Sequence, residues 1–329
     1  MLLLKSMQHK NILVLGGAGY IGSIIVEELI KKRYNVIAYD NLSKGHRGAV
    51  ECTFVQGDIA DSNLLNETMK KFNIDAVMHF CALSLVGESM ERPGDYFRNN
   101  VASSLNILEA MRQNNVKKIV FSSSAATYGE PKQIPIQEDD PTTPTNPYGE
   151  TKLMFEKMLK WYKTIYEIDF VALRYFNAAG ATELHGEHHD PETHLIPIIL
   201  DVAIRKREAV SIFGADYPTK DGTCIRDYIH VLDLASAHLL ALEYPDSGIF
   251  NLGSGEGFSN KEIVETAEKV TGKIINKKFV DRRAGDPAVL IASSAKAKAI
   301  LGWQPKFSLQ EIILSAWLWK QKHPDGYDN

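Results

Sequence analysis

Two residues four positions apart, Tyr148 and Lys152, have the types and spacing of a proton acceptor with an electrostatic partner. Asn146 can cap a helix and Pro147 suits its first position, which would put both side chains on one helical face. A free tyrosine has a pKa of about 10, but a neighbouring ammonium and a helix N-terminus both favour the phenolate. We therefore predict a tuned base at Tyr148, although a tyrosine and a lysine on a helix surface would show the same spacing. The apolar residues that indicate this helix are Leu153, Met154, Met158 and Trp161.

A glycine-rich segment separates an apolar run at residues 11–15 from an amphipathic pattern that ends near residue 33. A second apolar run, at residues 35–39, ends at Asp40. This order of strand, glycine turn, helix, strand and acid is typical of a dinucleotide-binding unit, whose backbone amides approach a pyrophosphate. Asp40 can accept hydrogen bonds from the adenosine ribose and would repel a 2′-phosphate, so we predict NAD rather than NADP. The glycines are Gly16, Gly19 and Gly22.

Further apolar runs at residues 53–56, 76–80, 119–121 and 170–173 alternate with helical patterns. The alternation predicts an α/β fold, a Rossmann-type doubly wound parallel sheet with helices on both faces. Ligands of such sheets bind beyond the carboxyl ends of the strands, so residues at those ends are candidates for a site. They are Asp40, Asp58, Phe80, Ser122, Ser124, Tyr175 and Asn177.

The composition is that of a soluble globular protein. The 329 residues carry a net charge of −4, which gives no reason to expect nucleic acid or an anionic membrane as a partner. Three widely spaced cysteines suit a reducing cytoplasm better than a disulfide framework or a zinc motif. The apolar run at residues 1–5 is too short for a signal peptide, and no segment approaches the roughly 20 apolar residues of a membrane span.

The chain divides near residue 177. We expect a NAD-binding Rossmann domain over residues 1–177, rejoined by part of 228–253, and a smaller C-terminal substrate-binding domain over 178–329. The polar segment 181–197 is rich in acids and histidines, which invites a metal site. Its spacing fits no fixed ligand motif and no helix would gather these side chains, so we expect a solvated loop and no metal. The acids and histidines are Glu183, His185, Glu187, His188, His189 and Asp190.

The glycine turn, Ser124 and the Tyr148/Lys152 pair together resemble the extended short-chain dehydrogenase/reductase family. Narrower motifs resemble the 4-epimerases of UDP-sugars within that family, and the resemblance covers about residues 10–328. These motifs stand at residues 39–42, 86–89, 121–125, 174–180, 221–231, 282–286 and 317–319. The resemblance implies interconversion of UDP-galactose and UDP-glucose by transient oxidation at C4 with tightly bound NAD. It also implies a homodimer and small-molecule UDP-sugars as partners.

The resemblance implies a role for individual residues. Tyr148 would be the base, Lys152 its partner and a ligand of the nicotinamide ribose, and Ser124 the hydroxyl that positions the sugar O4. Further cofactor contacts would come from Gly16, Gly19, Tyr20, Ile21, Gly22, Asp40, Asn41, Asp58, Ile59, Phe80, Ala82, Leu83, Asn99, Ser122 and Tyr175. Substrate contacts would come from Ser124, Tyr148, Asn177, His194, Leu195, Phe213, Arg226, Arg283, Asp286 and Leu290.

The chain departs from the family pattern at Ser84, where a lysine is common, and at His194, where an asparagine is usual. Leu290 stands where some members carry a bulky aromatic residue, so we expect room for an N-acetyl group.

Another NAD-dependent nucleotide-sugar enzyme, a 4,6-dehydratase or a decarboxylase, is the alternative. Ala125 and Ala126 follow Ser124 where a dehydratase has an acid/base pair. A non-catalytic NAD-binding regulator would not need a tuned base.

Overall fold

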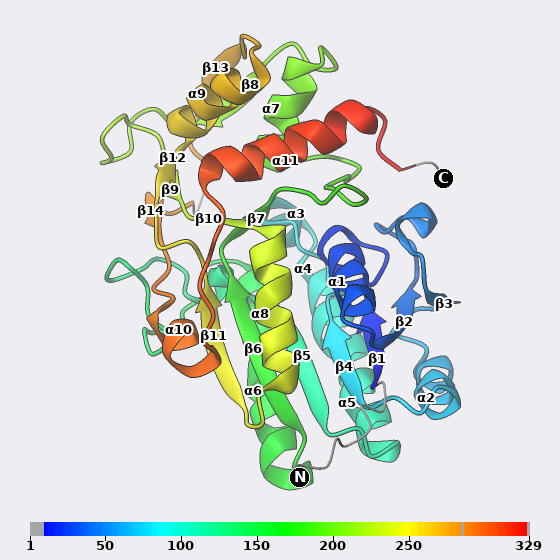
Figure 1. Ribbon diagram of the computed structural model, residues 1–329. Coiled ribbons are helices and arrows are strands. Elements are labelled where there is room, and N and C mark those ends of the chain that lie inside the picture. Colours follow the sequence, from blue (N-terminus) through cyan, green and yellow to red (C-terminus); the bar gives the residue numbers. More distant parts are fainter. Residues whose placement is uncertain (1–9, 284–285, 328–329) are drawn as a thin grey trace, which may run out of the picture.

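The computed structural model describes residues 10–283 and 286–327. The apolar run at residues 1–5 and residues 284–285 of the 282–286 motif therefore lie outside the described residues. Over the described part of the chain, a seven-stranded parallel sheet runs in the order β3-β2-β1-β4-β5-β6-β11 (Figure 1). Its strands are β1 (Asn11–Leu15), β2 (Asn35–Asp40), β3 (Thr53–Gln56), β4 (Ala76–His79), β5 (Lys118–Ser124), β6 (Asp169–Tyr175) and β11 (Gly248–Leu252). This strand order confirms the predicted doubly wound Rossmann-type sheet.

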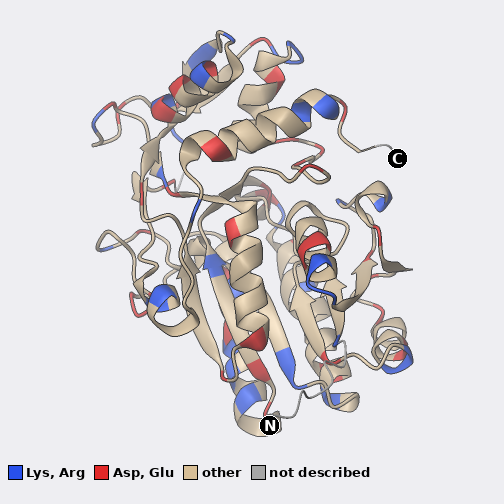
Figure 2. Ribbon diagram, viewed as in Figure 1, with Lys and Arg blue, Asp and Glu red and all other residues tan. Residues whose placement is uncertain are grey.

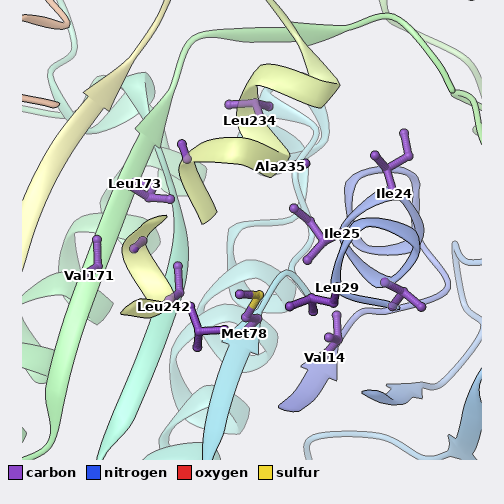
Figure 3. Packing of buried hydrophobic residues seen from close by; sticks show 14 of the residues in the cluster. Val14, Ile24, Ile25, Leu29, Met78, Val171, Leu173, Leu234, Ala235 and Leu242 are labelled. Atoms are coloured by element: carbon purple, nitrogen blue, oxygen red, sulfur yellow. The ribbon is translucent and has the colours of Figure 1, made fainter. Parts of the chain in front are cut away.

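Strand β1 shows why the sheet is covered on both faces. Ile12 and Val14 belong to one buried cluster with α1 and α8, whereas Leu13 and Leu15 belong to another with α2, α5 and α6. Successive side chains of a strand point to opposite faces, so a continuous apolar run fills both cores. Figure 3 shows the first cluster, where Ile25 of α1 faces Ala235 of α8 and Leu29 of α1 lies beside Met78 of β4. These helices are α1 (Tyr20–Lys31), α2 (Ser62–Lys71), α5 (Ser104–Gln113), α6 (Pro147–Tyr166) and α8 (Val231–Glu243).

A smaller group of elements lies beyond one end of the sheet strands (Figure 1). Its core comes mainly from α7 (Leu195–Ala203), α9 (Asn260–Thr271) and α11 (Leu309–Lys322). A capping box of Ser259 and Glu262 starts α9. The short strands are β7 (Asn177–Ala179), β8 (Val210–Phe213), β9 (Ile225–Arg226), β10 (Tyr228–His230), β12 (Phe258–Ser259), β13 (Lys277–Val280) and β14 (Val289–Leu290). The remaining helical segments are η1 (Arg47–Ala49), α3 (Val86–Glu91), α4 (Pro93–Phe97), η2 (Arg98–Ser103), η3 (Ala125–Thr127) and α10 (Ala295–Leu301).

The chain returns to the sheet after entering this smaller group. From β10 it runs into α8, and β11 then pairs with β6 at the edge of the sheet. The sheet therefore includes residues 248–252, well beyond residue 177.

Helix α6 presents a different face to the core from the one its apolar spacing suggested. Leu153, Phe155 and Leu159 are buried, but Met154 is exposed and Trp161 is 66 % exposed. The buried face also includes Glu156, which pairs with Arg174, and Lys152, which donates to the carbonyl oxygen of Ser122. These buried polar residues interrupt the apolar period, so the sequence pattern could not identify the correct face.

The charged residues of the ribbon are of both signs and interspersed, and the sheet strands are mostly uncharged (Figure 2). Among the described residues, no helix combines the length and apolar character needed to cross a membrane.

Candidate active site

Ser124, Tyr148 and Lys152 come together where β5 ends and α6 begins. The side chain of Asn146 accepts from the backbone N–H of Gly149 at 2.9 Å, which confirms the predicted cap. One turn further, the buried Lys152 donates from Nζ to the carbonyl oxygen of Ser122 at 2.7 Å. Its Nζ lies 5.8 Å from the centre of the Tyr148 ring. The tyrosine is thus held between a strand-end hydroxyl and a buried ammonium.

The electrostatics of this group differ from the expectation. Burial raises the pKa of Tyr148, and a hydrogen bond with the Ser124 side chain only opposes that rise. Burial also lowers the pKa of Lys152 to about 8, against the opposing charges of Cys81 and Glu156. The lowered pKa predicted at Tyr148 is therefore not found, because loss of hydration outweighs the hydrogen bond with Ser124.

The glycine turn has the shape that a dinucleotide needs. A Cβ on Gly16 would lie 2.6 Å from the backbone nitrogen of Cys81, and one on Gly22 would lie 2.0 Å from the carbonyl oxygen of Gly16. At Gly19 the nearest atom to such a Cβ is 3.4 Å away. Gly16 and Gly22 are therefore required by packing within the protein, while the backbone at Gly19 stays accessible to a phosphate at the start of α1.

Asp40 is buried at the end of β2, beside this turn. Its carboxylate accepts from the backbone N–H of Ala18 at 3.0 Å and from that of Leu42 at 2.8 Å. Burial raises its pKa, and these two hydrogen bonds oppose the rise. Each carboxylate oxygen can accept more than one hydrogen bond, so Asp40 can hold the turn and still receive a ribose hydroxyl.

One cavity of about 380 Å³ collects most of the predicted site residues. Those lining it are Gly16, Gly19, Tyr20, Ile21, Gly22, Asp40, Asn41, Ile59, Phe80, Ala82, Leu83, Asn99, Ser122, Ser124, Tyr148, Lys152, Tyr175, Asn177 and His194. Asp58 does not line it and instead accepts from the side chain of Asn41 at 2.7 Å. Ser84 also lies on the wall. The glycine turn, the buried Asp40 and the cavity together fit a nicotinamide dinucleotide.

Asn100 positions this cavity and was missed by the sequence analysis. Its buried amide accepts from the backbone N–H of Leu83 at 2.9 Å and donates to the carbonyl of the same residue at 2.9 Å. It also donates to the hydroxyl of Thr151 on α6 at 3.1 Å. The amide thereby links the segment after β4 to α6. Nothing in the sequence distinguished it from its neighbour Asn99.

Several of the predicted substrate residues lie outside the lining of that cavity, whereas Asn177 and His194 lie on it. Arg226 and Asp286 pair with each other, Nη2 to Oδ1, at 2.5 Å. The guanidinium of Arg283 lies 4.0 Å from the centre of the Phe213 ring. Leu290 on β14 is the register partner of Arg226 on β9, and its side chain is half-buried. Leu195, the first residue of α7, is also absent from the cavity wall.

The loop between β7 and α7 is not the solvated segment that we expected. Four of its side chains, Glu187, His189, Glu192 and His194, bring one potential ligand atom each to within 4.8 Å of one another. Burial lowers the pKa of both imidazoles, but the two carboxylates outweigh burial and raise it to about 9 at His189 and about 10 at His194. The expectation was wrong because a folded loop can gather side chains without helical spacing.

Known proteins match this chain over most of its length. A family model described as NAD dependent epimerase/dehydratase family matches residues 12–253. A protein of Halalkalibacterium halodurans named UDP-glucose 4-epimerase is 57 % identical over 324 residues, 96 % of this chain and 97 % of that protein. The crystal structure of UDP-glucose 4-epimerase from Bifidobacterium longum in complex with NAD+ and UDP has a TM-score of 0.93 and 38 % identity, covering 97 % and 100 % of the two chains. The UDP-Glc/GlcNAc 4-epimerase of Campylobacter jejuni has a TM-score of 0.84 and 40 % identity, covering 95 % and 99 %.

Proposed function

The chain belongs to the NAD dependent epimerase/dehydratase family, and we infer that it is a UDP-glucose 4-epimerase, which interconverts UDP-galactose and UDP-glucose with NAD. The observation that carries this function is the placement of Ser124, Tyr148 and Lys152 on the wall of the cavity that also holds the glycine turn. A base beside a nicotinamide site suits the oxidation and reduction of a carbinol carbon. Ala125 and Ala126, which follow Ser124, cannot supply the acid/base pair of a dehydratase.

The reaction needs a base because the C–H bond at C4 is not acidic, so the carbon cannot be inverted by deprotonation alone. NAD, when bound, supplies the hydride acceptor and later the hydride donor. Tyr148 takes the proton of the O4 hydroxyl and returns it after the sugar has turned. Ser124 hydrogen-bonds the same oxygen, and the ammonium of Lys152 stabilises the phenolate.

The UDP moiety must stay in place while the sugar turns. Arg226 and Arg283 can hold the diphosphate, because a guanidinium matches two phosphate oxygens at once. Asp286, which now pairs with Arg226, would release it and accept from the uridine ribose. Binding energy from this remote end would leave the sugar ring free to rotate.

The direct test is to incubate the purified protein with UDP-galactose, without added NAD, and to identify the product by NMR. We expect UDP-glucose to accumulate to equilibrium, because the cofactor is regenerated in each turnover. Unchanged UDP-galactose in the presence of protein-bound NAD would overturn this function.

We propose that the enzyme also accepts N-acetylated UDP-sugars, because Leu290 is smaller than an aromatic residue and is only half-buried beside Arg226. Leu290→Tyr should lower kcat/KM for UDP-N-acetylglucosamine and should leave kcat/KM for UDP-glucose within a few fold of the natural value. The reason is that steric exclusion discriminates between substrates more strongly than a lost methylene contact, which is worth about 1–3 kcal/mol. Leu290→Met conserves volume and serves as the control. Turnover of the acetylated substrate that survives Leu290→Tyr undiminished would place the selective contact elsewhere.

We further propose a homodimer in the cytoplasm. Met154, Trp161 and Ile165 are exposed on α6, and Leu105 is exposed on α5, which packs beside it. Exposed apolar side chains at helical spacing favour contact with a second copy. The cysteines described here are free, as a reducing compartment requires. Light scattering should give twice the chain mass for the natural protein and a lower mass for Trp161→Glu. A monomeric natural protein would contradict the proposal.

A further inference from the structure

The loop between β7 and α7 places two histidines and two glutamates around one point. His194 Nδ1 lies 2.8 Å from Glu187 Oε1 and 3.1 Å from Glu192 Oε1. His189 Nδ1 lies 3.4 Å from Glu187 Oε1 and 3.6 Å from Glu192 Oε2. Ligands about 2.0–2.2 Å from a tetrahedral zinc ion are separated by roughly 3.3–3.6 Å. These nitrogen–oxygen separations of 2.8–3.6 Å are near the ligand spacing around such an ion, and one ligand atom of each residue lies within 4.8 Å of the others.

The burial of these groups supplies a second, independent observation. The side chains of Glu187 and Glu192 are both only 9 % exposed, so two carboxylates lie together with little water around them. His189 Nδ1 is buried and makes no hydrogen bond, although it stands beside both of them. A buried nitrogen without a partner costs free energy unless something binds it. The group thus places two buried carboxylates, each paired with the imidazoles, beside a buried nitrogen that makes no hydrogen bond.

We propose that Glu187, His189, Glu192 and His194 form a binding site for a divalent transition-metal ion of the zinc class. Imidazole nitrogens and carboxylate oxygens suit zinc, and two carboxylates neutralise its charge. The chain fills all four tetrahedral positions, which is typical of a structural site rather than one that activates water. His194 is 45 % exposed, so an ion can reach the site from solvent.

The position of the site gives the ion a structural consequence. The ring of His189 contacts that of Tyr20, a residue of the glycine turn, edge to face at 6.3 Å between centroids. Lys44 donates to the carbonyl of Asp190 at 2.8 Å, which ties the same loop to the segment after β2. Glu187, His189 and His194 also line the cofactor cavity. An ion bound here fixes the loop that closes the cavity on the side of α7.

The test uses the full-length protein with any histidine tag removed. After dialysis against a chelator, Zn²⁺ is titrated in competition with a chromophoric chelator, and metal content is measured by mass spectrometry. We expect one ion per chain and a higher melting temperature with zinc. Co²⁺ in its place should show the visible absorption of tetrahedral coordination by nitrogen and oxygen.

Matched variants on the same loop identify the ligands. Glu187→Gln and His189→Asn should weaken zinc binding at least tenfold. Glu183→Gln and His188→Asn, which change the same residue types outside the cluster, should leave it unchanged. Circular dichroism and NAD content verify that each variant is folded. Failure of the natural protein to bind zinc, or equal binding by Glu187→Gln and Glu183→Gln, would overturn the proposal and leave a cluster of imidazolium–carboxylate pairs.

Discussion

Replacing Tyr148 by phenylalanine should lower kcat for UDP-galactose by about 10²–10⁴-fold, the usual contribution of a positioned acid or base. The variant removes one hydroxyl from a half-buried ring and leaves the glycine turn and Asp40 untouched, so NAD should remain bound. Ser124 and Lys152 stay in place but cannot take the O4 proton. Turnover is measured by NMR under saturating substrate, and cofactor content by absorbance after denaturation.

Tyr166→Phe on the same helix is the control, because that ring lies at the far end of α6 and outside the cavity. It should turn over substrate at the natural rate. If Tyr148→Phe also kept the natural rate, another group would have to be the base. If it lost NAD along with activity, the hydroxyl would be holding the cofactor rather than moving a proton.

Replacing Glu156 by glutamine should lower the free energy of unfolding by about 3–5 kcal/mol, the cost of leaving a buried charge without its partner. Glu156 is 1 % exposed and accepts from Arg174, which is 4 % exposed, through Oε1 at 2.9 Å and Oε2 at 2.6 Å. It also accepts from Ser123 on β5 at 2.6 Å. Because an arginine stays charged at any ordinary pH, Arg174 cannot relieve the loss by giving up its proton. Urea unfolding followed by circular dichroism measures the change.

Two further variants separate this buried pair from an ordinary ion pair. Asp95→Asn removes a carboxylate that pairs with the exposed Arg92 and Arg98 and should change stability by at most about 1 kcal/mol. The double variant Glu156→Met with Arg174→Met removes both charges and should recover most of the stability, because apolar replacements of a buried pair are often neutral. An effect of Glu156→Gln no larger than that of Asp95→Asn would show that the pair does not hold α6 against the sheet.

Much of the fold could be predicted because its signals are local. The run at residues 11–15, the glycines and Asp40 lie within about thirty residues, and their order alone identifies the dinucleotide-binding unit. Tyr148 and Lys152 share a helical turn, so their spacing places both on one face once Asn146 starts the helix. Backbone periodicity and turn chemistry depend on neighbouring residues, which is why the order of strands and helices in the sheet, and the shared helical turn of Tyr148 and Lys152, could be read from the sequence.

The contacts that set the properties of these residues join distant parts of the chain, so they form only when the chain has folded. Arg174 forms an ion pair with Glu156, and Arg226 forms one with Asp286, sixty positions later in the chain. The side chain of Asn100 donates a hydrogen bond to Thr151 on another helix. A buried acid and an exposed one look alike in a sequence, because burial depends on what packs against the side chain. For the same reason, the sequence suggested a lowered pKa for Tyr148, whereas desolvation in the folded protein raises it. The loop ligands Glu187 and His194 likewise became neighbours only when the irregular backbone between β7 and α7 folded back on itself, which no repeating period encodes.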